Sequence, residues 1–120
     1  MKIAVFYNLP FSGAKRTVQE HVKGLSRLGD EIDVYSINPK EDIFSPELYA
    51  ENVFSYTYSR KIINLPFFKK ISEDLSDFYL LKNLHKKIAK DIDVNNYDFV
   101  LVHTDFYTQA PFLLKFLKTK

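Results

Sequence analysis

The chain of 120 residues contains no cysteine and no tryptophan, and it has only three glycines and one methionine. The lack of cysteine excludes a disulfide framework and a thiolate metal site. No apolar run approaches the roughly 18 residues that a membrane-spanning helix needs, and the first residues lack the long apolar segment of a secretory signal. A formal net charge of +2 is too small to indicate a nucleic acid partner. These features are typical of one cytoplasmic domain.

The first thirty-seven residues carry the clearest pattern in the chain. An apolar run, Lys2–Tyr7, precedes a turn-rich loop, Asn8–Gly13, and an amphipathic segment, Ala14–Leu28, leads to a second apolar run, Glu31–Ile37. This order predicts a strand, a loop, a helix and a strand, which is the first unit of an open α/β sheet. Ligands of such sheets bind outside the carboxyl ends of the strands, so the loop Tyr7–Ala14 is where we expect a ligand.

Further elements alternate along the rest of the chain. We expect a strand at 53–58, a helix from about Ser72 to Ile92 with Ser72 as its cap, a buried central parallel strand at Phe99–His103 and a helix from Ala110 to Leu117. The predicted fold class is therefore α/β, a three-layer Rossmann-like domain with a mainly parallel sheet. The last helix should lead to another strand, and none follows, so we expect a fragment of a longer protein.

Two segments resemble a known family. The start, MKIAVFYNLPFSGAKRTVQEHVKGLSRLGDEIDVYSI, and the later YDFVLVHTDFYTQAPFLL are similar to the N-terminal domain of family 4 retaining glycosyltransferases of the GT-B fold. His103 falls on the histidine that ends the family's strand motif. The residues of the first segment that match are Pro10, Gly13, Ala14, Arg16, Val18, Leu25, Leu28, Gly29, Asp30, Glu31 and Val34.

The resemblance implies that residues 1–120 form the acceptor-side domain of a glycosyltransferase and that a nucleotide-binding C-terminal domain is missing. The implied reaction transfers a sugar from a nucleotide-sugar donor to a hydroxyl acceptor, polysaccharide or lipid-linked, with retention. It uses neither a cofactor nor a metal. The chain alone is expected to have little or no transferase activity without the missing domain or a partner subunit.

The resemblance also assigns candidate site residues. The loop formed by Ser12, Gly13 and Ala14 would approach the donor diphosphate, although the family loop usually carries more glycine. His103 is the candidate catalytic residue and would hydrogen-bond to the donor sugar, the other interpretation being a structural histidine at a strand end.

Other polar residues near these segments leave alternatives open. Lys15 and Arg16 would attract phosphate or acceptor charge, because a cation is otherwise unfavourable at a helix N-terminus. Asp105 either contacts an acceptor hydroxyl or, in the interpretation we prefer, solvates its loop. We expect His21 and His85 to face solvent.

Apolar and basic residues mix in the segment 60–70. Exposed, this segment would suit peripheral contact with the inner face of a membrane. The favoured interpretation is that its apolar residues cover the sheet edge or form the acceptor pocket.

Two other functions fit the same pattern. One is a stand-alone binding module of flavodoxin-like topology that holds a phosphate-bearing ligand with the first loop. The other is a non-catalytic interaction domain. The transferase hypothesis requires the loops 7–14 and 103–109 to be neighbouring rims of one crevice between adjacent parallel strands.

Overall fold

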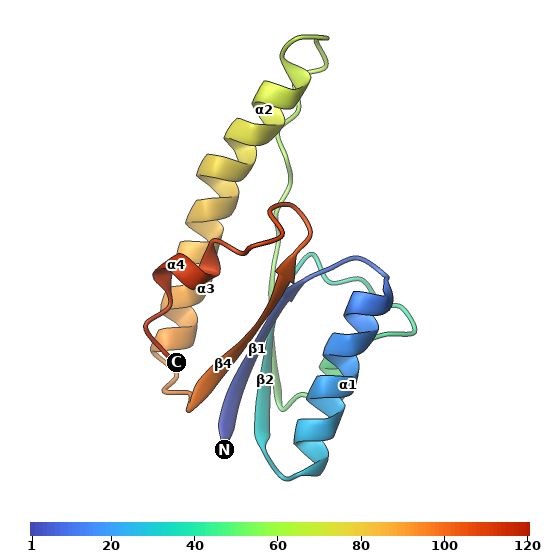
Figure 1. Ribbon diagram of the computed structural model, residues 1–120, viewed down its shortest axis with the longest axis vertical. Coiled ribbons are helices and arrows are strands. Elements are labelled where there is room, and N and C mark those ends of the chain that lie inside the picture. Colours follow the sequence, from blue (N-terminus) through green and yellow to red (C-terminus); the bar gives the residue numbers. More distant parts are fainter.

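The computed structural model describes residues 1–120 and contains one four-stranded sheet with helices on both faces (Figure 1). No helix is both long enough and apolar enough to cross a bilayer. The elements in chain order are β1 (Lys2–Asn8), α1 (Gly13–Arg27), β2 (Glu31–Ile37), the 3-10 helix η1 (Pro46–Tyr49), β3 (Asn52–Tyr56), α2 (Lys69–Ser76), the π-helical segment η2 (Asp77–Leu81), α3 (Lys82–Asp93), β4 (Phe99–Asp105) and α4 (Leu113–Phe116).

The strands are all parallel and lie in the order β3-β2-β1-β4. In the central strand, Val5 pairs with Val34 on one side and with Leu101 on the other. This order matches the first four strands of the dinucleotide-binding sheet, with the reversal of strand order between β1 and β4. It differs from the flavodoxin order, in which β3 lies beside β1. The predicted α/β class is thus confirmed, and the flavodoxin-like topology of the alternative is wrong.

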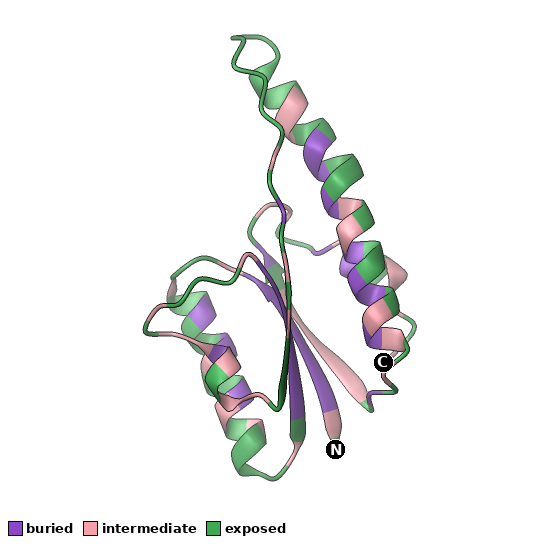
Figure 2. Ribbon diagram, turned by 180° about the vertical axis from the view of Figure 1, so that it is seen from behind, coloured by how far each residue is buried: buried purple, intermediate pink, exposed green.

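The core lies in two layers, one on each face of the sheet. Alternate residues of β1 point to opposite faces: Val5 packs against Val18 of α1, and Phe6 belongs to the layer that contains Leu81 and Ile88. Figure 2 shows the two inner strands buried along most of their length. Helix α1 therefore covers one face and α3 with α4 the other, which confirms the predicted three layers.

The most buried strand is β1, not the strand 99–103 that the apolar run indicates. The side chains of β4 from Phe99 to His103 are only half-buried, because β4 is an edge strand with β1 as its one neighbour in the sheet. At its outer edge the Val100 amide donates to the Lys120 carbonyl at 2.6 Å. The chain end thus returns to the sheet.

Helix α1 begins and ends at the signals that its sequence carries. Ser12 is the N-cap, and its hydroxyl accepts a hydrogen bond from the Lys15 amide at 3.3 Å. Gly29 has φ +89°, the left-handed conformation that favours glycine. The amides of Gly29 and Asp30 donate to the carbonyls of Ser26 and Leu25, so the helix ends in a Schellman motif.

The long helix differs from its prediction. It runs without a break from Lys69 through α2, η2 and α3 to Asp93, and Ser72 is not its cap. The Ser72 hydroxyl instead accepts from the Ile63 amide at 3.1 Å and donates to the Lys69 carbonyl at 2.8 Å. A serine that bonds an adjacent segment does not mark a helix start.

Strand β3 is also shorter than expected, because an asparagine side chain replaces the sheet ladder at its end. Asn38 donates from Nδ2 to the Tyr58 carbonyl at 2.6 Å and accepts at Oδ1 from the Tyr58 amide at 2.9 Å. The last helix is likewise reduced to Leu113–Phe116 from the expected 110–117.

Candidate functional site

A cleft opens at the carboxyl edge of the sheet, at the reversal of strand order between β1 and β4. One rim is the segment Asn8–Phe11 after β1, and the other is Phe106 and Tyr107 after β4. The Phe106 amide donates to the Asn8 carbonyl at 2.8 Å, so the rims touch. The cleft has a volume of about 350 Å³, and the remaining lining residues are Lys15, Ile37, Asn38, Lys40, Tyr58 and Ser59. The expected juxtaposition of the two loops is confirmed.

The candidate phosphate loop lies beside this cleft. Ser12, Gly13 and Ala14 stand in the chain between two lining residues, Phe11 and Lys15, but do not line the cleft themselves. Gly13 and Ala14 are exposed, and neither amide donates a hydrogen bond within the chain, so these two amides of α1 are open to an approaching group. Such amides and the positive end of the helix dipole favour an anion.

Lys15 is a buried cation with an internal partner. Its side chain is 1% exposed, and its Nζ donates to Asp42 Oδ2 at 2.7 Å and to the Lys40 carbonyl at 2.9 Å. Burial raises the pKa of Asp42, but hydrogen bonds from Lys15 and the Phe44 amide outweigh it and hold this pKa below its ordinary value. The unfavourable place of Lys15 at a helix start is therefore explained by Asp42. Arg16, by contrast, is exposed.

Asp105 is buried and does not solvate its loop, so the interpretation preferred from sequence is wrong. Its Oδ2 accepts from Asn8 Nδ2 at 2.8 Å, and its Oδ1 accepts from the amides of Tyr107 and Thr108 at 2.7 and 3.1 Å. Burial alone would raise the pKa of Asp105, but contacts with His85, Asn8 and the Tyr107 amide lower it. The ionised carboxylate ties the two rims together.

His85 is fully buried next to Asp105, so the expectation that it faces solvent is wrong. Its Nδ1 accepts from the Leu113 amide at 3.1 Å, which leaves the ring proton on Nε2, 3.2 Å from Asp105 Oδ2. That contact is too poorly aligned to be a hydrogen bond, so its attraction is electrostatic. The ring also packs edge-on against Phe6, with centroids 5.2 Å apart.

A signal in the sequence could have found this histidine. Leu81, His85, Ile88 and Ile92 follow one another at four- and three-residue steps along the long helix, and all four are buried.

His103 lies on the α1 face of the sheet and does not line the cleft. Its ring centroid is 5.4 Å from that of His21, and its Nε2 is buried without a hydrogen-bond partner. Burial and, to a smaller extent, His21 lower the pKa of His103. His21 is exposed, as expected. The catalytic role of His103 stays a prediction.

A polar cluster that the sequence did not indicate lies behind two lining residues of the cleft, Tyr58 and Tyr107. Tyr58 donates to Asp77 Oδ1 at 2.5 Å, and Arg60 donates to both oxygens of that carboxylate at 3.0 and 2.6 Å. The Arg60 guanidinium also lies 4.5 Å from the centre of the Tyr107 ring. Burial, followed by the bond to Asp77, raises the pKa of Tyr58 to about 12. Tyr58 and Tyr107 are thus held in fixed positions.

The cleft combines aromatic side chains with polar groups and holds no metal centre. Phe11 and Phe106 are both largely exposed at the rims, and the polar side chains of Asn8 and Asn38 lie among the lining residues. A few polar groups among aromatic ones is the usual composition of a small-molecule site. No group of three or more side chains is placed to bind a metal ion.

The fold and the cleft define a Rossmann-like α/β domain with a cleft at its topological switch point. No model of a known protein family matches the sequence, and no curated protein matches it. Among solved structures, the chain is similar to a UGT transferase from Siraitia grosvenorii in complex with UDP, at 11% identity and a TM-score of 0.45. The likeness covers 85% of this chain, which spans 23% of the length of that one.

Proposed function

We propose that this domain is the acceptor-side wall of a glycosyltransferase that moves a sugar from a nucleotide-sugar donor to a hydroxyl acceptor with retention. The observation that carries the proposal is the meeting of the loops after β1 and β4 in one cleft. These loops belong to the two segments that resemble family 4 glycosyltransferases. The proposed site of action is the cytoplasm, and a nucleotide-binding domain or subunit would supply the opposite wall.

The proposed chemistry depends on position and charge. The open amides of Gly13 and Ala14, next to the N-cap Ser12, would face the donor diphosphate, and their partial positive charge would stabilise the negative charge that develops on this leaving group. Arg16, exposed on the same helical turn, would add a full positive charge. Neither a metal nor a cofactor enters this scheme.

Two further residues have different parts in the proposal. Asp105 is a positioning residue, because it holds Asn8 and the start of the β4 loop in register and is itself buried. His103 would hydrogen-bond to the donor sugar. Since its ring lies beside His21, the structure offers this role less support than it offers the α1 amides.

Amide chemical shifts of the 120-residue chain test the proposal. We expect millimolar UDP-glucose or GDP-mannose to shift the signals of Gly13, Ala14, Phe106 and Tyr107, because these amides lie in or beside the cleft. A nucleotide sugar should bind more tightly than the corresponding nucleoside diphosphate. Equal binding of the two would favour a phosphate-binding module, and shifts confined to other surfaces would refute the proposed cleft.

Two glycines of α1 provide a matched pair of variants. Neither Gly13 nor Gly24 has an atom within 4 Å of an added Cβ, so Gly13→Ala and Gly24→Ala should both fold. Only the first places a methyl group at the amides that would meet the diphosphate. We expect Gly13→Ala to weaken nucleotide-sugar binding by about tenfold, the equivalent of about one good hydrogen bond, and Gly24→Ala to leave it unchanged.

A further inference from the structure

A narrow arm rises from the body of the protein. It consists of an extended segment, residues 57–68, which rises to the tip of the molecule, and of α2 and η2, which return beside it in the opposite direction (Figure 1). The molecule measures 52 × 32 × 18 Å, and the arm lies along its long axis. We define the tip as residues 61–71, all of which are exposed.

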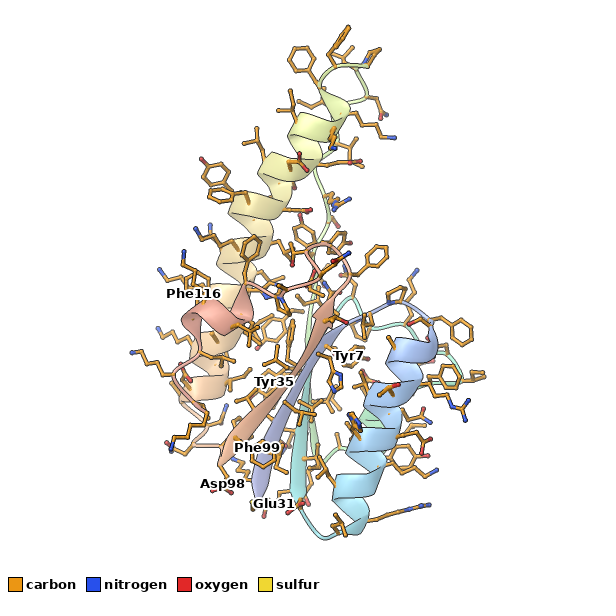
Figure 3. All side chains as sticks on the ribbon, in the orientation of Figure 1. Tyr7, Glu31, Tyr35, Asp98, Phe99 and Phe116 are labelled. Atoms are coloured by element: carbon orange, nitrogen blue, oxygen red, sulfur yellow. The ribbon has the colours of Figure 1, made fainter.

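The tip exposes large apolar side chains that nothing covers. Phe67 is 86% exposed, and Figure 3 shows apolar side chains projecting outward around the turn. Monomeric soluble proteins seldom expose contiguous apolar patches of more than a few hundred Å², and larger ones mark sites of association. The exposed apolar residues of the tip are Ile62, Ile63, Leu65, Phe67, Phe68 and Ile71.

The charge on the tip has one sign. Lys61, Lys69 and Lys70 lie among the apolar residues, and no acidic residue occurs from 61 to 71. The next carboxylates, Glu73 and Asp74, come further down the arm. Apolar side chains interspersed with lysines match a surface that is apolar inside and anionic outside.

The arm is held away from the body by side-chain hydrogen bonds between its two halves. Ser72 Oγ accepts from the Ile63 amide at 3.1 Å, and Ser76 Oγ accepts from the Lys61 amide at 3.0 Å. Below them, Arg60 forms its two bonds to Asp77. The extended segment therefore cannot fold onto the sheet without loss of these bonds.

We propose that the tip binds the surface of an anionic lipid bilayer, with Phe67, Phe68 and their apolar neighbours in the interfacial region and the three lysines at the headgroups. A narrow turn with side chains on all sides suits insertion to the 5–10 Å depth typical of interfacial segments. This inference does not depend on the proposed transferase activity.

Vesicle co-sedimentation of the 120-residue chain tests the proposal. We expect binding to vesicles of equimolar phosphatidylcholine and phosphatidylglycerol, and little binding to phosphatidylcholine alone. Binding should fall steeply in about 1 M salt, where the Debye length is about 3 Å. Absence of binding to the anionic vesicles at low salt would overturn the proposal.

Charge variants distinguish vesicle binding by the tip from a general attraction caused by the net charge of the chain. Each lysine near an anionic surface contributes about fivefold to binding, so Lys61→Gln, Lys69→Gln and Lys70→Gln combined should weaken it on the order of a hundredfold. The combination of Lys86→Gln, Lys87→Gln and Lys90→Gln removes three exposed charges from α3 and should change binding by less than about fivefold. Equal losses in both would overturn the proposal.

Apolar variants test insertion in the same way. Phe67→Ser with Phe68→Ser should weaken vesicle binding at least about tenfold, because two exposed phenyl groups lose their apolar contact. The control, Ile43→Ser with Leu48→Ser, alters two largely exposed apolar residues of the body and should have no effect.

A single tryptophan provides a direct measure of insertion, since the chain has none of its own. In Phe67→Trp, emission should shift to the blue and be quenched by brominated lipid when anionic vesicles are added. Unchanged emission of vesicle-bound protein would overturn the proposal. Sedimentation velocity gives a second test without lipid. A dimer that the double variant Phe67→Ser, Phe68→Ser abolishes would also overturn the proposal, because the tip would then bind a second copy of the chain.

Discussion

The body and the arm of this protein use similar residues in opposite ways. In the body, Phe6 of β1 is fully buried in the core layer that also contains Leu81 and Ile88 of the long helix. In the arm, Phe67 is almost fully exposed. Both regions are rich in phenylalanine, leucine and isoleucine, so composition alone does not separate them. The difference lies in what covers each side chain.

The two regions are also held together by different forces. Burial of apolar surface stabilises the body on both faces of β1. The arm is tied by a few hydrogen bonds, chiefly at Asp77, whose carboxylate accepts from Tyr58 and Arg60. A region held mainly by such bonds can keep its apolar side chains on the surface. Its order then depends on single polar residues.

The largest expected effect is a difference in the free energy of unfolding between variants of Phe6 and of Phe67. Phe6→Ala should lower the free energy of unfolding by about 3–5 kcal/mol, because it opens a cavity in the core. Phe67→Ala should change it by less than about 0.5 kcal/mol, as is usual for an exposed residue. Urea denaturation followed by circular dichroism measures both. Similar losses in the two variants would show that the arm folds onto the body in solution.

A smaller, local effect is expected at the base of the arm. Asp77→Ala leaves the Tyr58 hydroxyl and the Arg60 guanidinium without their acceptor, and should cost about 1–3 kcal/mol. We expect hydrogen exchange, read by mass spectrometry, to speed up in residues 57–81 while β1 and β2 stay protected. Asp74→Ala, on the exposed side of the same helix, serves as the control. Uniform loss of protection over the whole chain would contradict a separately held arm.

The smallest effect concerns pH and the body alone. Since the pKa of His103 is lowered in the fold, the unfolded chain binds more protons below about pH 6.5, the ordinary pKa of histidine. The contribution of His103 to stability is therefore complete above about pH 6.5 and is lost as pH falls through its folded pKa. In the variant His103→Gln, the urea midpoint of unfolding should depend less on pH than in the unmodified chain.

The ring signals of His103 check the same point directly. By NMR titration, its pKa should lie below that of a model histidine. His21→Gln should raise it, because a neighbouring positive charge is removed, but not to the ordinary value, because burial remains. A pKa of His103 at or above the ordinary value would contradict the burial of its Nε2.

The order and type of the main elements could be predicted because local patterns determine them. Apolar runs separated by an amphipathic, capped segment predict β1, α1 and β2 almost residue by residue. The place of β4 could not be predicted in this way, since an apolar run does not tell whether one neighbour strand or two will pair with it. The start of the long helix was missed because Ser72 bonds a residue nine positions away.

The site was predictable only in outline. Strand ends of a parallel sheet meet at one edge, so the two loops could be placed together from sequence. The partners of Lys15 and Asp105 could not, because Asp42 and His85 are 27 and 20 positions away in the chain and follow no local rule. The orientation of His103 depends on how β4 lies beneath α1. These are properties of the assembled fold.

Tyr58 and Tyr107 belong to both regions, which has a practical consequence for mutagenesis. Each lines the cleft, and each also contacts the group that anchors the arm: Tyr58 through Asp77, Tyr107 through the face of its ring against Arg60. Truncation of either tyrosine will therefore disturb the lining of the cleft and the orientation of the arm at once. Phe11 and Phe106, which line the cleft, are largely exposed and do not touch Asp77 or Arg60, are the positions from which affinity data can be assigned to the cleft.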